Sequence, residues 1–432
     1  MSDTHARTVA FVRDAMIPEQ TPPVTERGAV KWMRENLFNG RLSAVLTALS
    51  LLVIAWAVMA IGPWLMNSVW KAGSLSECRQ ILDGTSGACW GVIRDRLHQL
   101  MFGFYPTHLY WRPILTLVLL FVALAPILYP WVPRKLIWFS AIFPFLGYWL
   151  LWGGTIWVPV SAALGFVAGY VALLALRNFG TLIATSAALI APILWWLVVA
   201  GNFAAIMQST IPLGIEGVRS DRFGGFLISL VIGFTGIGLS LPLGILLALG
   251  RQSNMVLIKS VCVIFIEFIR GVPLITLLFT AQLLLGYFLP PGTSFDLILR
   301  VIIMVTLFAA AYLAEVVRGG LAALPRGQYE AADALGLDYW KAQRLIIMPQ
   351  ALKISIPGIV NTFIGLFKDT TLVVFIGLLD PVGLSNAIRA SSDWQGIYWE
   401  LFIFIGAVFF IFCFGMSRYS MYLERRLRTD HR

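Results

Sequence analysis

Apolar runs of nearly membrane-spanning length recur from end to end of this chain, and they restrict its fold more than any other feature. A helix needs about 20 apolar residues to cross a bilayer. Hydrophobic residues make up 59% of the 432 residues and charged residues only 12%, with a mean hydropathy of +0.81. Soluble proteins carry about 45–50% apolar and about 25% charged residues, and a soluble core could not bury this excess. The sequence therefore predicts an all-α polytopic membrane protein.

The apolar runs predict about ten transmembrane helices. The seventh run is too long for one straight helix and contains Gly271 and Pro273, where we expect it to break. The ninth is interrupted near Lys368. Most lysine and arginine residues fall on the side of the membrane where ten spans place both termini, so both termini are expected in the cytoplasm. The predicted spans cover residues 43–66, 113–131, 136–153, 158–176, 180–200, 223–249, 255–289, 298–317, 352–378 and 399–417.

These spans divide the chain into three segments. Residues 1–42 are expected to form a cytoplasmic tail and an interfacial helix over 29–38, although this helix could instead be the first turns of the next span. Residues 43–221 form an N-terminal extension with about five transmembrane helices and one long external loop at 67–112. Residues 222–432 contain the remaining five helices.

The long external loop holds two of the four cysteines, Cys78 and Cys89. Outside the membrane these two could form a local disulfide if the compartment is oxidising, or they could both remain thiols. Cys262 and Cys413 lie in apolar runs, where we expect them to pack without reacting.

A charged stretch between the eighth and ninth runs, residues 325–349, predicts two short helices. Residues 330–332, Glu-Ala-Ala, favour a helix with a low-profile face that another protein could approach closely. Gly336 can adopt a positive φ, which would end this helix and start a second one over 338–344 at a fixed angle. We expect Pro349 to end the second helix, just as the chain becomes apolar again.

This spacing resembles the EAA loop of ABC importer permeases: Glu-Ala-Ala, three residues, Gly, nine residues, Ile, one residue and Leu-Pro. The pattern departs only at Met348, which stands in place of leucine. In that family the loop forms a coupling helix that docks into a groove on a separate ATPase subunit. The residues that the resemblance implies for this contact are Glu330, Ala331, Ala332, Gly336 and Leu337.

Two further motifs narrow the resemblance to the permeases of polar amino-acid importers of the histidine and glutamine type. Residues 269–274, Ile-Arg-Gly-Val-Pro-Leu, look like their Arg-Gly-x-Pro-Leu element. Residues 367–372, Phe-Lys-Asp-Thr-Thr-Leu, look like their Lys-Asp-(Ser/Thr)-(Ser/Thr)-Leu element. With its hydrophobic extension, the whole chain is similar to the M-type permease subunits of bacterial general L-amino-acid importers. The resemblance implies that the last five helices form a type I ABC importer permease core in the bacterial inner membrane.

The resemblance also implies a function and a set of partners. It implies that the complex imports L-amino acids from periplasm to cytoplasm, with a cytoplasmic ABC ATPase dimer, a second homologous permease subunit and a periplasmic amino-acid-binding protein. ATP and Mg would bind to the ATPase, and this chain would bind no cofactor of its own. Membrane lipid would surround the spans.

Ionisable side chains inside the apolar runs are costly in a bilayer, so each is a candidate functional residue. Glu267 and Arg270 are three apart on one helical face and could pair with each other. Arg270 also lies directly before the break at Gly271, and its guanidinium would suit the bidentate capture of a substrate carboxylate. Glu315 and Arg318, three apart at the end of the eighth run, are expected to be a structural or gating pair.

Thr362 and Asp369 are seven apart, so they nearly superpose on one face of a helix. Asp369 could accept a substrate ammonium group, and Thr362 could contact whatever projects from the α-carbon. Lys368 could instead neutralise Asp369. The resemblance places the substrate path in the same region, which includes Thr370.

The sequence predicts a non-catalytic chain. It has no Gly-x-x-x-x-Gly-Lys-Ser/Thr loop for a nucleotide, so ATP hydrolysis is expected on a separate subunit. The four histidines show no metal-ligand spacing, and no motif of a nucleic-acid-binding module is present.

An ion-coupled secondary amino-acid transporter with five-plus-five inverted repeats is the alternative, because five spans in each half would give the halves opposite orientations. The two halves show no sequence similarity, and the loop at 325–349 would have no role in such a protein. The ABC importer permease is therefore the preferred prediction.

Overall fold

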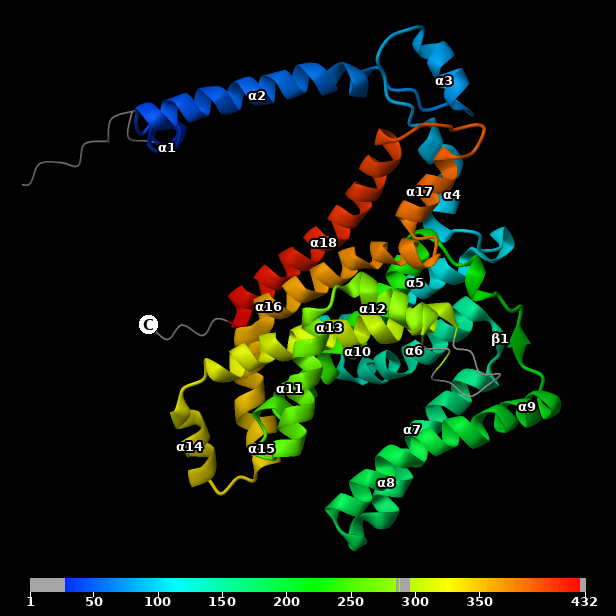
Figure 1. Cartoon of the computed structure of the whole chain (residues 1–432), viewed down its shortest axis with the longest axis vertical. Coiled ribbons are helices and arrows are strands. Elements are labelled where there is room, and N and C mark those ends of the chain that lie inside the picture. The colour runs from blue at the N-terminus through cyan, green and yellow to red at the C-terminus, as the bar shows by residue number, and fades with distance from the viewer. Residues whose placement is uncertain (1–27, 285–286, 288–295, 428–432) are drawn as a thin grey trace, which may run out of the picture. The chain divides into compact units, whose positions relative to one another are not determined.

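The computed structural model describes residues 28–284, 287 and 296–427, so the predicted tail at 1–27 lies outside the described residues. The described chain is almost entirely helical, and a short antiparallel sheet pairs β1 (Gly154–Thr155) with β2 (Gly214–Ile215) (Figure 1). The chain divides into two compact units, residues 1–69 with 79–88 and residues 70–78 with 89–432.

In its described residues the smaller unit contains two complete helices. α1 (Gly28–Asn36) is separated by residues 37–40 from α2 (Arg41–Met66), so α1 is a helix in its own right and not the first turns of the span. The Thr47 hydroxyl donates to the carbonyl oxygen of Leu37 over 2.8 Å and links α2 to this connection. α2 is apolar and buries none of its residues, as a helix surrounded by lipid would. The position of α1 on a membrane surface stays a prediction.

The larger unit contains the other spans, and the short helix α3 (Leu75–Leu82) is shared between the two units. The part belonging to the extension consists of α4 (Gly91–Phe102), α5 (Trp111–Leu128), α6 (Ile137–Trp152), α7 (Trp157–Leu176), α8 (Thr181–Leu194), the π turn η5 (Trp195–Val199) and α9 (Ala200–Thr210). The part belonging to the C-terminal half consists of α10 (Gly225–Gln252), α11 (Val256–Gly271), α12 (Leu274–Leu283), α13 (Leu297–Ala322), α14 (Arg326–Ala334), α15 (Tyr339–Ala342), the π turn η8 (Gln343–Ile347), α16 (Met348–Asp369), the 3-10 helix η9 (Thr370–Ile376), α17 (Pro381–Arg389) and α18 (Trp399–Leu427). Single 3-10 turns are η2 (Thr107–Leu109), η3 (Arg134–Leu136), η4 (Arg177–Phe179) and η6 (Ser220–Arg222).

The expected number of spans is confirmed for the described residues. Nine helical runs are long and apolar enough to cross a membrane, and the pair α11 and α12 makes up to ten. This pair is bent by 103° where α11 ends at Gly271 and α12 begins at Leu274, as the sequence predicted. Pro273 lies in the break because it has no N–H to continue the hydrogen-bond ladder of α11.

The predicted end of a helix at Pro349 is wrong. α15 continues through the π turn η8 into α16 without a break, so the ninth span begins at Tyr339. In this turn the N–H of Met348 donates to the carbonyl oxygen of Gln343, five residues earlier. The wider turn makes room for the ring of Pro349, which would otherwise clash with the carbonyl oxygen four residues before it.

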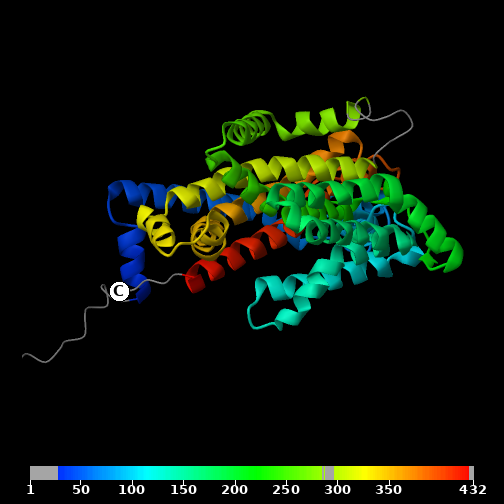
Figure 2. The ribbon, with the colours of Figure 1, turned by 90° about the horizontal axis from the view of Figure 1, so that it is seen from below.

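Close helix packing holds the C-terminal half together. α13 packs along both α10 and α16, and α16 packs on α18 (Figure 2). A Cβ atom at Gly244 would lie 2.7 Å from the Cβ of Leu313, so glycine at this position lets α10 and α13 approach each other closely. Buried side chains such as Ile232 and Val305 fill the centre of this packing.

The extension contacts the C-terminal half at both ends of the α5–α6 pair. At one end the Trp152 ring stacks on Phe223 with their centroids 4.6 Å apart. At the other end the Tyr419 hydroxyl of α18 donates to the carbonyl oxygen of Leu128 over 2.5 Å. The α5–α6 pair is therefore held at two separate levels.

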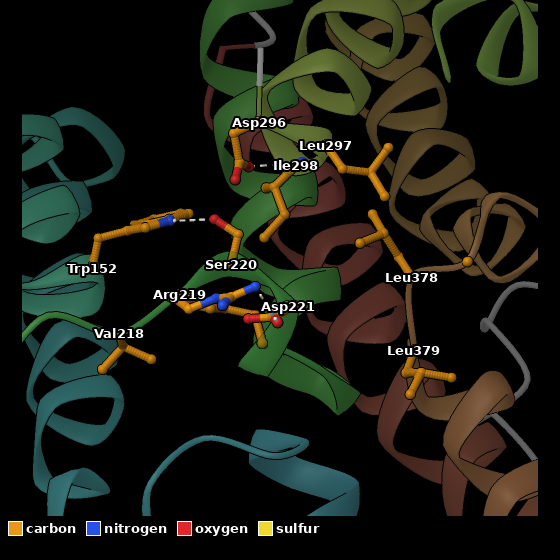
Figure 3. A pocket seen from close by; sticks show the side chains of 12 residues that line it. Trp152, Val218, Arg219, Ser220, Asp221, Asp296, Leu297, Ile298, Leu378 and Leu379 are labelled. Atoms are coloured by element: carbon orange, nitrogen blue, oxygen red, sulfur yellow. Dashed lines mark hydrogen bonds and ion pairs between the residues drawn. The ribbon is translucent and has the colours of Figure 1, made fainter. Parts of the chain in front are cut away.

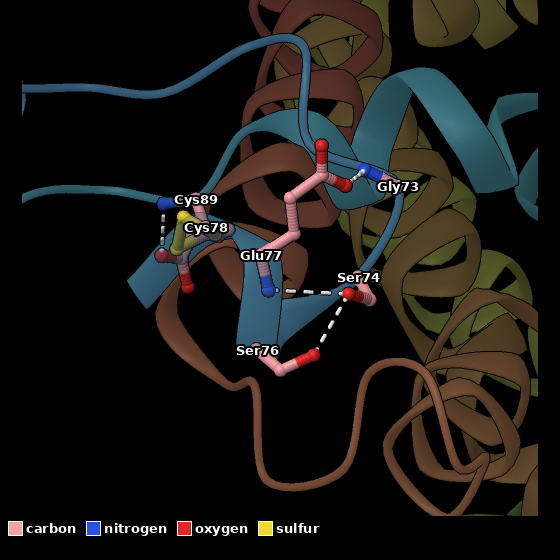
Figure 4. Close-up of a disulfide and its surroundings, with 7 residues drawn as sticks. Gly73, Ser74, Ser76, Glu77, Cys78 and Cys89 are labelled. Carbon is pink, nitrogen blue, oxygen red and sulfur yellow. Dashed lines mark hydrogen bonds between the residues drawn. A yellow bond between two sulfur atoms is a disulfide. The ribbon is translucent and has the colours of Figure 1, made fainter. Parts of the chain in front are cut away.

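The predicted external loop is closed by a disulfide between Cys78 and Cys89, which settles the question that the sequence left open (Figure 4). The N–H of Cys89 donates to the carboxylate of Glu400 at the start of α18 over 2.7 Å. The indole N–H of Trp394, whose side chain is fully buried, donates to Asp95 over 2.9 Å. These contacts fix the loop to the connection between α17 and α18.

Candidate functional site

Thr362 and Asp369 line one cavity of about 240 Å³ between α13 and α16. Both lie on the same face of α16, as their spacing of seven residues predicted. α13 contributes Phe308, Ala309 and Tyr312 to the opposite wall. The cavity therefore places a carboxylate and a hydroxyl among aromatic and aliphatic side chains inside a membrane span.

Arg270 lies next to this cavity through its contact with Tyr312. Its guanidinium carbon is 5.6 Å from the centre of the Tyr312 ring, a distance at which a cation is attracted to the ring face. The nearest carboxylate oxygen, on Glu315, is 4.0 Å from Arg270 Nη1. The Nε atom of Arg270 is buried and has no hydrogen-bond partner among the described residues. Arg270 is thus only loosely paired.

Five charged side chains from α10, α11 and α13 gather at this level, and we call them the charge cluster: Arg251, Glu267, Arg270, Glu315 and Arg318. Arg251 Nη1 lies 2.7 Å from Glu267 Oε1 and 2.6 Å from Glu315 Oε1. The contact with Glu315 is an ion pair without hydrogen-bond geometry. Arg318 Nε donates to Glu315 over 2.9 Å, which confirms their predicted pairing. Glu267 therefore pairs with Arg251, and its possible pairing with Arg270 is wrong.

The other two residues predicted near the path have different surroundings. Thr370 is fully buried outside the cavity lining, and its hydroxyl donates to the carbonyl oxygen of Phe367 over 2.7 Å. Lys368 is exposed, and within the described part of the chain no ion pair of 4.0 Å or less joins it to Asp369. Asp369 thus lines the cavity without an ion pair to Lys368, and Thr370 does not line it.

Arg251 and Tyr312 are the residues that the sequence did not single out. Arg251 falls between the predicted sixth and seventh spans, but α10 extends to Gln252, so Arg251 lies on this helix and contacts α11 and α13. Tyr312 is three residues before Glu315, hence on the same face of α13. This spacing could have identified Tyr312 from the sequence. No local sequence pattern pointed to Arg251.

The loop predicted to couple to a partner forms an elbow of two helices, α14 and α15. Gly336 has a φ of +67°, and the space around it is open, as predicted for the residue that ends α14. Its N–H donates to the backbone carbonyl oxygen of Asp333 over 2.9 Å, and the N–H of Leu337 donates to the carbonyl oxygen of Ala332 over 3.2 Å. This pair of bonds is a Schellman motif, which needs a left-handed residue at the position of Gly336.

Only some of the residues that were predicted to contact an ATPase are exposed on the elbow. Glu330 and Ala331 are exposed and Leu337 is half-buried, whereas Ala332 is 1% exposed and packs inward. Large apolar side chains are exposed beside them, with 72% of Leu335, 53% of Tyr339 and 66% of Trp340 accessible. The elbow therefore carries an apolar surface on a polar loop, which is typical of a protein interface.

A second pocket, of about 500 Å³, lies where η9 ends and α13 begins (Figure 3). The Trp152 indole donates to Ser220 over 2.8 Å, and Arg219 and Asp221 form an ion pair at 3.0 Å. Asp296 caps α13 by accepting from the N–H of Ile298. Each of these polar groups thus has a partner in the chain. In the described residues no group of three or more His, Cys, Asp or Glu side chains could hold a metal ion.

Comparison with known proteins gives two long relatives. The chain is 60% identical to the glutamate/glutamine/aspartate/asparagine transport system permease protein BztC of Rhodobacter capsulatus, over all of both chains. It is 39% identical to the inner membrane amino-acid ABC transporter permease protein YhdY of Escherichia coli, over 93% of this chain and 94% of that one.

Shorter relatives match less than half of the chain. The probable glutamine ABC transporter permease protein GlnP of Bacillus subtilis is 31% identical over 47% of this chain and 91% of its own. A solved structure, the crystal structure of an amino acid ABC transporter with histidines, is 31% identical over 46% of this chain and 91% of that chain, with a TM-score of 0.42.

The family match and the two long relatives favour an ABC permease over an ion-coupled secondary transporter. The family model for the binding-protein-dependent transport system inner membrane component matches residues 240–429, which include the charge cluster, the cavity and the elbow. Together with full-length similarity to two amino-acid permeases, this match shows that the chain belongs to the family of binding-protein-dependent transport system inner membrane components and is the permease subunit of an amino-acid ABC transporter.

Proposed function

We propose that α-amino acids pass through this permease by way of the cavity lined by Thr362 and Asp369, on their way from periplasm to cytoplasm. The observation that carries the proposal is the carboxylate of Asp369 in a cavity within a membrane span. An ionisable group at that depth is costly unless it has a function or a partner. An ammonium group on a passing substrate would be such a partner.

Arg270 would recognise the other end of the same substrate. A guanidinium binds a carboxylate through two parallel hydrogen bonds, and Arg270 is the loosely paired arginine of the charge cluster. Its contact with Tyr312 keeps it beside the cavity. Asp369 and Arg270 together would recognise the ammonium and carboxylate groups that all α-amino acids share, while Thr362 would face the variable side chain.

The substrates are proposed to include acidic amino acids and their amides. Support comes from the printed name of the relative at 60% identity, which transports glutamate, glutamine, aspartate and asparagine. A neutral Thr362 would accept both the charged and the amide forms, because it adds no charge to the cavity.

Transport would be driven by a cytoplasmic ABC ATPase dimer that docks on the elbow through Glu330, Ala331 and the neighbouring Leu335, Tyr339 and Trp340. The exposed apolar surface of these residues supports this contact. ATP and Mg would bind to the ATPase. Because α15 runs without interruption into α16, a displacement of the elbow would reach Thr362 and Asp369 along one helix.

Two further partners complete the proposed complex. A second homologous permease subunit would complete the path. A periplasmic amino-acid-binding protein would deliver the substrate, as the words "binding-protein-dependent" in the family description suggest. Both termini would face the cytoplasm in the inner membrane, because Arg425 and Arg426 end the last span and positive charge favours that side.

The test is uptake by the reconstituted complex carrying Asp369→Asn. We expect uptake of all α-amino acids to fall alike, because the ammonium group is common to them. Asp393→Asn is the matched control, since Asp393 is an exposed carboxylate whose pairing with Arg96 at 3.2 Å contributes little. Loss of basic substrates alone would contradict the assigned role of Asp369.

A further inference from the structure

A separate apolar cavity of about 450 Å³ lies between the extension and the C-terminal half. The α5–α6 pair forms one wall and α10 forms the other, with smaller contributions from α4 and α13. The family model begins at residue 240, so α5 and α6 lie outside the part of the chain that it matches. Residues that represent the three helices around the cavity are Leu117, Val118, Phe143, Gly147, Val231 and Thr235.

The cavity lies at membrane depth along these helices. Its α5 lining runs from Pro113 to Leu120, and its α6 lining runs from Phe143 to Trp152. Both segments belong to helices long and apolar enough to span a bilayer. The cavity therefore occupies one half of the bilayer thickness, next to the ends of α5 and α6 that carry Trp111 and Trp152.

Water is a poor occupant for this space. A buried water needs two to four polar partners, and apolar cavities in proteins stay dry. The hydroxyl of Thr116, one of the few polar groups in the lining, already donates to the carbonyl oxygen of Arg112 over 2.8 Å. The lining is otherwise dominated by aliphatic and aromatic side chains.

Contacts on either side of the cavity fix the α5–α6 pair against the C-terminal half. The stacking of Trp152 on Phe223 holds one end of the α5–α6 pair, and the bond from Tyr419 to Leu128 holds the other. Between these two contacts, the side chains that line the cavity would have no atoms to pack against if the cavity were empty, and they would lose dispersion contacts. An apolar occupant would restore them.

The cavity also reaches the lipid-facing surface. Ile114 and Val118 line it, and 51% and 54% of these residues are exposed. A flexible hydrocarbon chain could therefore enter from the bilayer without leaving an apolar environment.

From this geometry we propose that the acyl chain of a membrane phospholipid occupies the cavity and forms part of the contact between the extension and the permease core. The acyl chain would fill the space between the α5–α6 pair and α10 and so contact both walls of the cavity. This inference concerns the extension and stands apart from the proposed route of the substrate, because none of the residues around this cavity lines the one at Asp369.

Native mass spectrometry of the detergent-purified full-length chain, with the subunits that co-purify, tests the proposal. We expect the wild type to retain phospholipid on this chain, identified by mass. Leu117→Trp from the α5 wall and Thr235→Phe from the α10 wall should each fill the space and lose that lipid. Leu115→Trp is the matched control, because Leu115 is on α5 but does not line the cavity, and it should keep the lipid.

Retention of the lipid by both filling variants at the wild-type level would overturn the proposal. So would a wild type that carries only detergent or free fatty acid, because the site would then not select a phospholipid. The two filling variants lie on opposite walls, so poor folding of one of them leaves the other as the test. The result does not depend on transport, so it is distinguishable from a failure of the proposed substrate path.

Discussion

The guanidinium of Arg251 lies 2.6 Å from the carboxylate of Glu315, and this ion pair joins α10 to α13 near the cavity that Asp369 lines. The side chain of Glu315 is 16% exposed and also accepts a hydrogen bond from Arg318. One largely buried carboxylate therefore balances more than one arginine.

We expect Glu315→Gln to lower the thermal stability of the purified protein more than Glu267→Gln does. Removing one partner of a buried ion pair leaves an uncompensated charge and costs about 3–5 kcal/mol. Glu267 pairs with the same Arg251, but its side chain is 54% exposed, so solvent screens the pair and its loss should cost much less. Melting temperatures in detergent would measure both, and equal losses would contradict the central position given to Glu315.

Asp380 predicts a pH dependence of stability. It is fully buried, and its carboxylate caps α17 by accepting from Gly383 over 2.8 Å and from Val382 over 3.2 Å. Burial outweighs these bonds and raises the pKa of Asp380 from 3.8 to about 6. The folded protein thus binds this proton more tightly than the unfolded chain, so the group favours folding at acid pH. That contribution is lost as the pH rises from about 4 to about 6.

Asp380→Asn should remove this dependence while keeping the cap, because asparagine caps helices as well as aspartate does. At pH 7.5 we expect the variant to melt at or above the wild-type temperature. At pH 4.5 its melting temperature should no longer exceed that of the wild type. Melting curves at the two pH values check this. A variant that is less stable than the wild type only at pH 7.5 would show that the ionised carboxylate is favourable.

The disulfide between Cys78 and Cys89 leaves Cys262 and Cys413 as free thiols. Maleimide labelling of the unfolded, unreduced chain should therefore add two labels, and reduction before labelling should raise the number to the four cysteines of the sequence. Intact-mass measurement counts the labels. Four labels without reductant would show that the loop is open in the native protein.

Features that depend on local spacing were predictable from the sequence. The break around Gly271 and Pro273 and the left-handed turn at Gly336 each follow from what one residue type does to the backbone. The common face of Thr362 and Asp369 follows from helical periodicity, and their shared cavity agrees with it.

Features that depend on neighbours across helices were not predictable. A proline normally stops a helix, and the π turn from Gln343 to Ile347 explains how α15 continues into α16 past Pro349. Glu267 had a plausible partner three residues away, but α10 brings Arg251 closer. Ala332 belongs to the Glu-Ala-Ala motif that was expected to contact the ATPase. It is nevertheless buried, because it lies on the face of α14 that packs against the rest of this chain.

In the proposed mechanism the elbow at Gly336 carries the movement of an ATPase into the spans, and a matched pair of glycine variants tests this role. Gly336 and Gly327 are both exposed, with no atom within 4 Å of an added Cβ, but only Gly336 has a positive φ. A side chain in that conformation costs about 1–2 kcal/mol and would change the angle of the elbow.

The measurement is ATP-driven amino-acid uptake, together with ATP hydrolysis stimulated by loaded binding protein, in proteoliposomes containing the complete complex. We predict that Gly336→Leu loses most of both activities and that Gly327→Leu keeps them. Wild-type uptake and wild-type stimulation in Gly336→Leu would contradict the account.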